Sequence, residues 1–198
     1  MPVTYLDPNA TALVLIDLQQ GIVAMPTEPH TTDQVIANAL KLADRFRAAR
    51  APVVLVHVAM SLDGSDRLRL EVDEPQQWRE MPPDFAKIVP GLKTNDGDII
   101  VTKKQWGAFY GTGLDLQLRR RGVRTIVLGG ISTNYGVEST ARDAYERSYN
   151  LVFAEDAMSA RAAEDHAFAL TRIFPRIGRL ASTQEVLAAL SNSGEGEH

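Results

Sequence analysis

The sequence has no cysteine among its 198 residues. Disulfide bonds, thiolate metal sites and cysteine nucleophiles are therefore excluded, whatever fold the chain adopts. The chain also lacks an apolar run close to the roughly 20 residues that a membrane helix needs, and it does not begin with a basic segment followed by an apolar one. We therefore expect a cytoplasmic protein without a membrane partner.

Clustered basic charge is also scarce. The formal net charge is −4, and the lysines and arginines are spread along the chain apart from Arg119, Arg120 and Arg121. This distribution gives no electrostatic footprint for nucleic acid, so we expect no nucleic-acid partner. The arginine triplet stands where a helix is expected to end, and cations there complement the helix dipole. An anionic ligand or a protein partner is the alternative interpretation of the triplet.

Continuous apolar segments, bounded by polar or turn residues, recur along the chain. Such runs are typical of parallel strands that are buried on both faces. With 44% hydrophobic residues over this length, we expect a single domain over residues 1–190, followed by a flexible Ser/Gly/Glu-rich tail at 191–198. The expected strands are Ala12–Ile16, Pro52–Val58, Asp98–Val101, Thr125–Leu128, Leu151–Ala154 and Arg179–Ser182.

Segments with the period of a helix separate these runs. They are Thr32–Arg50, Thr112–Arg121, Asn134–Arg147 and Ala160–Phe174. A capping-box pattern, Ser182-Thr-Gln-Glu185, predicts the start of a last helix. Alternating strands and helices favour a three-layer α/β/α fold with a mostly parallel, doubly wound, Rossmann-like sheet of about six strands.

One connection, Ala59–Lys93, interrupts this alternation. It is polar and punctuated by prolines, with Trp78 in its middle. Connections of this length are usually functional or have local structure of their own, and we expect this one to run over the carboxyl edge of the sheet, where open α/β sheets bind ligands.

Charged side chains follow two of the expected strands at that same edge. Asp17 ends the first strand, and Lys103 and Lys104 follow the third. Burial there would raise the pKa of Asp17 unless a cation is near, and a lysine could pair with it or stabilise developing negative charge. On position alone, Asp17 is as readily a turn or cap residue, and a lysine after a strand is most often a solvated surface group.

A glycine-rich segment, Gly129–Ala144, joins the fourth strand to the next helix. Its glycines allow close backbone approach, and the N–H groups at the start of the helix can bind an anion or oxyanion. It has neither the G-x-G-x-x-G spacing of dinucleotide-binding proteins nor the G-x-S-x-G turn of serine hydrolases.

Four motifs in this order resemble the isochorismatase-like hydrolase family, over nearly the whole chain from Ala12 to about Leu190. They are Val14-Leu-Ile-Asp17-Leu-Gln19, Val101-Thr-Lys103-Lys-Gln-Trp-Gly-Ala-Phe109, Gly130-Ile-Ser-Thr-Asn-Tyr-Gly136-Val, and Asp156-Ala157. The resemblance implies the isochorismatase-like hydrolase fold, a small-molecule substrate and a homo-oligomer, dimer or tetramer.

The resemblance also implies roles for individual residues. Asp17 corresponds to the family's acid/base aspartate. Lys103 corresponds to its active-site lysine, six residues before Phe109. A cis peptide bond is expected between Ile131 and Ser132, and the N–H groups of Ser132 and Gly136 would form an oxyanion hole. The expected substrate contacts are Trp106, Phe109 and Tyr135 as an aromatic rim, with Gln19, Ser132 and Asn134 as polar groups. Aromatic residues in such a loop are as readily core packing.

Gly136 is a departure from much of the family, because the amidase branches carry their catalytic cysteine there. Acyl-enzyme chemistry is excluded at a glycine. True isochorismatases also have glycine at this position, and they cleave a vinyl ether by protonating its enol carbon and adding water. The resemblance therefore implies a hydrolase that acts on a small polar metabolite without cysteine. The alternative is a catalytically silent relative that binds a metabolite or serves as an assembly partner.

Two further departures concern the ligand. Val58 stands where isochorismatases have a glutamine, and the metal-binding histidines of nicotinamidases are absent after the second strand. His57, on an apolar strand, is more readily a hydrogen-bonded core residue than a ligand. We therefore predict no metal and no cofactor.

Overall fold

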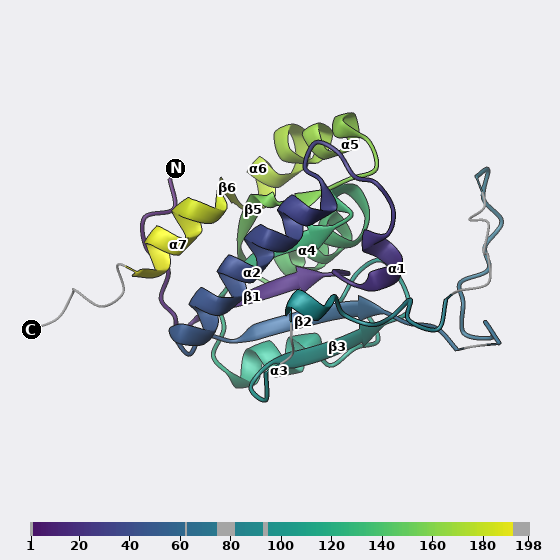
Figure 1. Cartoon of the computed structure of the whole chain (residues 1–198). Coiled ribbons are helices and arrows are strands. Elements are labelled where there is room, and N and C mark those ends of the chain that lie inside the picture. Colours follow the sequence, from purple (N-terminus) through teal and green to yellow (C-terminus); the bar gives the residue numbers. More distant parts are fainter. Residues whose placement is uncertain (1, 62, 75–81, 93–94, 192–198) are drawn as a thin grey trace, which may run out of the picture.

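The computed structural model describes residues 2–61, 63–74, 82–92 and 95–191 (Figure 1). Six parallel strands form one sheet in the order β3-β2-β1-β4-β5-β6. The chain winds from central β1 to one side and then, from β4, to the other, so the predicted doubly wound α/β sheet is confirmed. The strands are β1 Thr11–Ile16, β2 Val53–Val58, β3 Ile99–Lys103, β4 Thr125–Ile131, β5 Asn150–Ser159 and β6 Arg179–Ala181.

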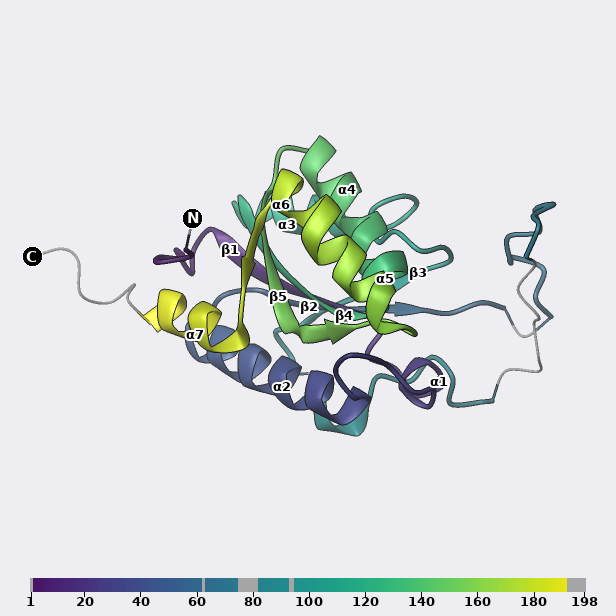
Figure 2. The same ribbon diagram turned by 90° about the horizontal axis from the view of Figure 1, so that it is seen from above.

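Helices cover both faces of the sheet, as Figure 2 shows, with α1, α2 and α7 on one face and α3 to α6 on the other. The helical elements are α1 Gln20–Val23, α2 Thr32–Ala48, η1 Pro90–Leu92, α3 Leu114–Arg120, η2 Thr133–Val137, α4 Glu138–Glu146, α5 Ala163–Phe168, η3 Ala169–Ile173, α6 Phe174–Ile177 and α7 Thr183–Ser191. Two cores result. Leu13 and Leu15 of β1 pack toward α2 and α7, while Val14 and Ile16 pack toward α3 and α4. This double burial is why β1 is apolar without alternation.

The ends of several elements differ from the sequence prediction. β5 continues past Ala154 to Ser159, although Glu155 and Asp156 interrupt the apolar run. The two predicted helices Asn134–Arg147 and Ala160–Phe174 each contain a five-residue π-helical turn, η2 and η3. Apolar periodicity does not distinguish a π turn from an α turn, so the π turns were not predicted. The elements α1 and η1 are only four and three residues long, too short to show a helical period.

The predicted capping box at the last helix is confirmed. The Ser182 N–H donates to Glu185 Oε2 over 2.7 Å, and the Glu185 N–H donates to Ser182 Oγ over 3.2 Å. The helix that follows ends at Ser191, the first residue of the predicted tail, and the rest of that tail lies outside the described residues.

The described parts of the long connection after β2 lie at the carboxyl edge of the sheet, as predicted. Figure 1 shows residues 63–74 extending outward on the side to which the strand arrows point. The returning segment lies beside the start of α1, where the Val89 N–H donates to Leu18 O over 3.1 Å and Gln19 bridges to Ile88. Residues 75–81, which include Trp78, lie outside the described residues.

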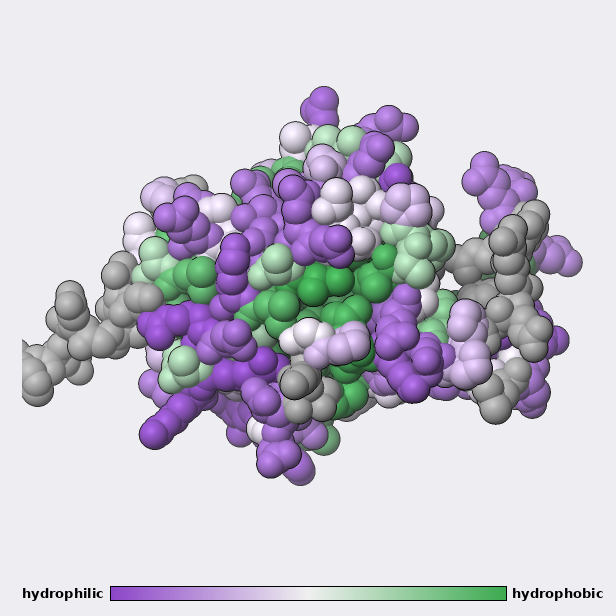
Figure 3. Space-filling view, in the orientation of Figure 1, coloured by the Kyte–Doolittle hydropathy of each residue, from purple (hydrophilic) through white to green (hydrophobic). Residues whose placement is uncertain are grey.

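Apolar atoms gather in the middle of the face that carries α2, as Figure 3 shows. Half-buried apolar residues that pack against the core on this face include Ile36, Leu40 and Ile88. No helix in the described part of the chain has the length and apolarity needed to cross a membrane.

Candidate active site

Asp17 and Lys103 meet at the carboxyl edge of the sheet although 86 positions separate them. Asp17 follows the last residue of β1 with a φ of 52°, and Lys103 is the last residue of β3. The Lys103 ammonium donates to Asp17 Oδ2 over 2.7 Å and to Gln105 O over 3.0 Å. Asp17 is 6% exposed and Lys103 2%, so this is a buried ion pair.

Burial dominates the electrostatics of Asp17. It raises the pKa of the carboxyl group to about 6, although the charge and hydrogen bond of Lys103 act in the opposite direction. The second oxygen, Oδ1, is buried and has no hydrogen-bond partner among the described residues. Burying a carboxylate oxygen without a donor is costly, so this oxygen is suited to hold a proton or to meet a donor from a ligand.

The neighbouring lysine lies elsewhere. Lys104 forms an ion pair of 2.7 Å with Asp66, and its side chain is 46% exposed. The structure therefore pairs Asp17 with the lysine that the motif spacing favours, and Lys104 is a surface group.

Gly136 lies directly beside this pair. A Cβ at position 136 would be 3.2 Å from Asp17 Oδ2 and 2.8 Å from Ile16 Cγ2. The end of β4 also presses closely on β1, since a Cβ at Gly130, whose φ is 123°, would lie 2.1 Å from Ile16 O. Gly130 is therefore required by its backbone conformation and its approach to the β1 backbone, whereas a side chain at position 136 would force Ile16 to shift. Ile16 could not be singled out from the sequence, because nothing in its strand pattern marks it as a neighbour of position 136.

The peptide bond between Ile131 and Ser132 is cis, as the resemblance implies. The chain then enters η2, where the N–H groups of Tyr135 and Val137 both donate to Ser132 O over 3.2 Å. The Ser132 hydroxyl donates to Asn134 Oδ1 over 3.0 Å. The loop thus carries Ser132, Asn134 and Gly136 on one turn at the start of the helical run that continues into α4.

Two of the three predicted rim aromatics lie at the surface. Trp106 and Tyr135 are 52% and 43% exposed, and their ring centroids are 4.8 Å apart. Phe109 is instead buried in the core, 5.9 Å from the ring of Tyr149, with the guanidinium of Arg147 over it at 5.0 Å. Trp106 and Tyr135 therefore stay candidates for a substrate rim, and Phe109 packs in the core.

Gln19 also differs from the expectation of a substrate contact. It is fully buried, its amide NH₂ donates to Val58 O and Phe85 O, both over 2.9 Å, and its carbonyl oxygen accepts from the Val58 N–H over 2.8 Å. With both N–H groups occupied, Gln19 ties the end of β2 to the returning segment of the long connection.

His57 is half-buried and hydrogen-bonded on both sides, as expected. Its Nδ1 lies 2.8 Å from Ala86 O and its Nε2 lies 2.7 Å from Thr102 Oγ1. Within the described residues, no three His, Asp or Glu side chains cluster as metal ligands do.

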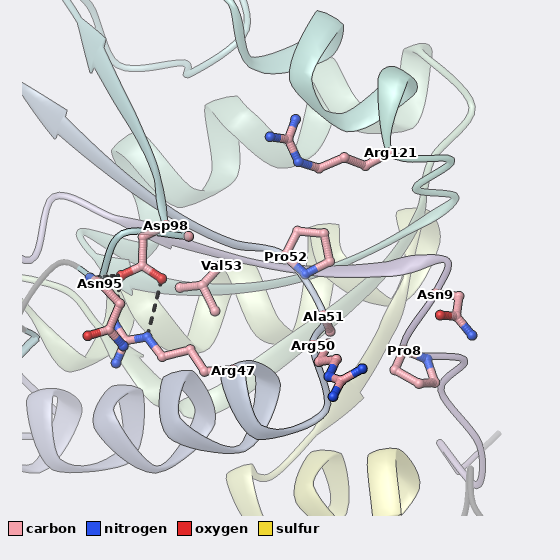
Figure 4. A pocket seen from close by; sticks show the side chains of 11 residues that line it. Pro8, Asn9, Arg47, Arg50, Ala51, Pro52, Val53, Asn95, Asp98 and Arg121 are labelled. Carbon is pink, nitrogen blue, oxygen red and sulfur yellow. Dashed lines mark hydrogen bonds and ion pairs between the residues drawn. The ribbon is translucent and has the colours of Figure 1, made fainter.

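Neither of two cavities formed by the described residues has Asp17 in its lining. One, of about 550 Å³, is at the opposite, amino-terminal edge of the sheet, where Arg47 donates to Asp98 over 2.7 and 3.2 Å (Figure 4). Arg121, the residue after α3, also lines it, so the arginine triplet does stand at a helix end. The other, of about 660 Å³, lies between His57 and residues 83–90.

Comparisons with known proteins identify the family of the chain. The isochorismatase domain matches residues 11–185 of the chain. The chain belongs to the isochorismatase family. It is 52% identical over 185 residues to the isochorismatase family protein YecD of Escherichia coli O157:H7. This match covers 93% of this chain and 98% of YecD. It is also 52% identical over 184 residues to YwoC of Bacillus subtilis, covering 92% and 95% of the two chains.

A solved structure shares the fold of this isochorismatase family member closely. An isochorismatase family protein from Burkholderia thailandensis superposes with a TM-score of 0.91 at 46% identity, covering 96% of this chain and 99% of the other. The six-stranded α/β architecture is thus that of the family.

Proposed function

We propose that this isochorismatase family hydrolase acts on a small polar metabolite by acid–base catalysis at Asp17, without a cysteine nucleophile. One observation carries the proposal. Asp17 is buried, one oxygen is held by Lys103 at 2.7 Å, and the other has no partner among the described residues. A carboxyl group in this state can give up and take back a proton near neutral pH.

The surroundings of Gly136 argue against an acyl-enzyme. Glycine offers no nucleophile, and nearby hydroxyl groups are already bonded. Thr140 Oγ1 donates to Gly136 O over 2.7 Å, and the Ser132 hydroxyl donates to Asn134. Loss of the nucleophile from a hydrolytic triad costs about a millionfold in rate, so amide hydrolysis is not the reaction that this site favours.

Cleavage of a vinyl ether needs only an acid, a base and water. The protonated Asp17 gives its proton to the terminal carbon of the C=C bond, and the positive charge is shared between the adjacent carbon and the ether oxygen. Water adds to that carbon and returns a proton to Asp17. The resulting hemiketal loses an alcohol and becomes a ketone, so one water is consumed overall.

Lys103 keeps the pKa of the Asp17 carboxyl group near neutral pH. Burial alone would push the pKa of Asp17 further up, and the ammonium pulls it back to about 6. At this pKa about one carboxyl group in ten is protonated at pH 7, which supplies the acid while the carboxylate remains available as base.

The remaining contacts concern substrate binding. The N–H groups of Ser132 and Gly136 are proposed to bind negative charge that develops on the substrate, and Asn134 to make a polar contact. The exposed rings of Trp106 and Tyr135 suit a small planar or cyclic molecule. Val58 stands where isochorismatases have a glutamine and has no side-chain amide. The proposal therefore names vinyl ethers as the substrate class and does not commit to isochorismate itself.

A substrate screen tests the proposal. Isochorismate, related vinyl ethers and small amides are incubated with the protein, and products are measured by mass spectrometry. We expect turnover of a vinyl ether and no turnover of amides. Amide hydrolysis at a comparable rate would overturn the proposed chemistry, and binding without any turnover would favour the silent relative. Sedimentation of the same preparation measures the predicted dimer or tetramer.

A further inference from the structure

A buried polar pair lies behind the loop that carries Gly136. Thr133, the first residue of η2, is fully buried, and its hydroxyl lies 2.9 Å from Nδ1 of His166 on α5. His166 is 4% exposed. Within the described part of the chain, neither residue forms a hydrogen bond with Asp17 or Lys103, so the proposed acid–base chemistry does not use them.

Three separate segments converge on this pair. The ring of His30, from the connection between α1 and α2, meets His166 edge-on with centroids 5.6 Å apart. His30 is itself held, since its N–H donates to Ser159 Oγ over 3.2 Å and its carbonyl accepts from Thr27 Oγ1 over 2.8 Å. Ser159 is paired in register with Ile131, the last residue before the cis peptide bond. The pair is therefore anchored to the ends of both β4 and β5.

A packing role alone does not account for the two polar groups. Valine would fill the space of Thr133, and a buried hydroxyl or imidazole is tolerated only while its hydrogen bond is made. Loss of one partner leaves the other desolvated and unpaired, so the bond favours a single geometry of the turn. Gly136 lies three residues after Thr133 on the same π-helical turn. A shift of Thr133 therefore moves Gly136 relative to Asp17.

We propose that His166 is a positioning residue, which through its hydrogen bond to Thr133 fixes the η2 turn and so places Gly136 and its backbone N–H opposite Asp17. The inference rests on the proposed function, because it assigns the pair to the geometry of that same site. His166 acts through Thr133 and does not touch the reacting groups.

His166 is neutral under physiological conditions, which suits this role. Burial, and to a smaller extent the nearby His30, lower its pKa to about 4. In a neutral imidazole, Nδ1 either accepts from the threonine hydroxyl or donates to it, and both arrangements keep one hydrogen bond.

The test separates positioning from stability. Thr133→Val and His166→Phe each remove the hydrogen bond and keep much of the volume, whereas Thr133→Ser keeps the hydroxyl. Thr183→Val is the matched control, since Thr183 is also buried and its hydroxyl holds another helix through a 2.7 Å bond to Asp156. All variants are compared by urea unfolding, by kcat and KM on a vinyl ether that the wild type hydrolyses, and by the amide NMR signal of Gly136.

We expect Thr133→Val and His166→Phe to lower kcat by about 10- to 100-fold with KM little changed, and the double variant to be no slower than either single one. Thr133→Ser should recover most of kcat, and Thr183→Val should lose stability alone. The Gly136 signal should move in the first two variants and not in Thr183→Val. Because this signal does not depend on turnover, the inference can be judged even if Asp17→Asn leaves turnover intact and the proposed function fails. An unmoved Gly136 signal, or a kcat loss equal to that of Thr183→Val, would overturn it.

Discussion

Ile16 Cγ2 lies 2.8 Å from the point where a Cβ at position 136 would stand, so the space beside Asp17 is shaped for a glycine. Any side chain at position 136 would meet Ile16 and approach Asp17 Oδ2. The last residue of β1 occupies the room that a cysteine would need, while the adjacent Asp17 and Lys103 keep their buried contact.

Gly136→Cys is predicted to destabilise the protein and not to create an amidase. Overpacking of this kind costs about 1 to 3 kcal/mol, and Ile16 is held in a central strand. The variant Gly136→Cys/Ile16→Ala should be less destabilised than the sum of its two single changes, because Ile16→Ala removes the clashing carbon. Urea unfolding of the four proteins measures the coupling. A Gly136→Cys protein as stable as the wild type would contradict this account of the glycine.

Lys103→Met is predicted to move the pH profile of the reaction upward. Lys103 lowers the pKa of Asp17, so its removal raises that pKa above about 6. If the protonated carboxyl is the acid, kcat/KM falls as pH rises through this pKa, and in the variant the fall occurs at higher pH. Lys104→Met is the control, since Lys104 pairs with Asp66 at the surface. Identical profiles for wild type and Lys103→Met would argue against the electrostatic role.

Asp17 should also leave a signature in stability against pH. Its pKa is about 6 in the folded protein against a model value of 3.8, so between these limits the folded state binds more protons than the unfolded state. Ionisation of Asp17 therefore lowers stability as pH rises from about 4 to about 6, with no further change above that range. Melting temperatures of wild type relative to Asp17→Asn should fall across this window. A constant difference from pH 4 to pH 7 would show that Asp17 ionises normally.

His166 should make stability rise with pH, whereas Asp17 makes it fall. The pKa of His166 is lowered from 6.5 to about 4 in the folded protein. As pH falls from 6.5 to 4, the imidazole is therefore protonated in the unfolded state and stays neutral in the folded state. The wild type should lose stability on acidification through this window more steeply than His166→Phe. Thermal unfolding of the two proteins at several pH values tests this, and parallel curves would count against the buried neutral imidazole.

Phe109 and Trp106 are predicted to respond differently to truncation. Phe109→Ala should cost about 3 to 5 kcal/mol of stability, because Phe109 is buried against Tyr149. Trp106→Ala should stay within about 0.5 kcal/mol of wild type, since Trp106 is half exposed, but should raise KM if it contacts substrate. Urea unfolding and KM together decide whether the two residues have the assigned roles.

Much of this arrangement could be predicted from the sequence, for identifiable reasons. The strands are apolar without alternation because both faces are buried, and parallel strands put their carboxyl ends at one edge, which brings Asp17 toward Lys103. The direction of loop side chains could not be predicted. Nothing in the local pattern shows that Phe109 turns into the core, or that the Gln19 amide binds the backbone of Val58.

The hydrogen-bond partners of buried polar residues could not be predicted from the sequence either. Thr133 and His166 are 33 positions apart, and only the packing of α5 on η2 brings them together. In the sequence, Ile16 is one apolar strand residue among several, and only the folded structure shows that it lies beside position 136.

The most direct test of the account is the turnover number of Asp17→Asn against that of wild type, on a vinyl ether that the wild type hydrolyses. Asparagine keeps the shape of the side chain and cannot give a proton to carbon. The account predicts a loss of about 10²- to 10⁴-fold in kcat, the usual contribution of a general acid, in a variant that remains folded. Turnover by Asp17→Asn at the wild-type rate would contradict the central claim that Asp17 carries the chemistry.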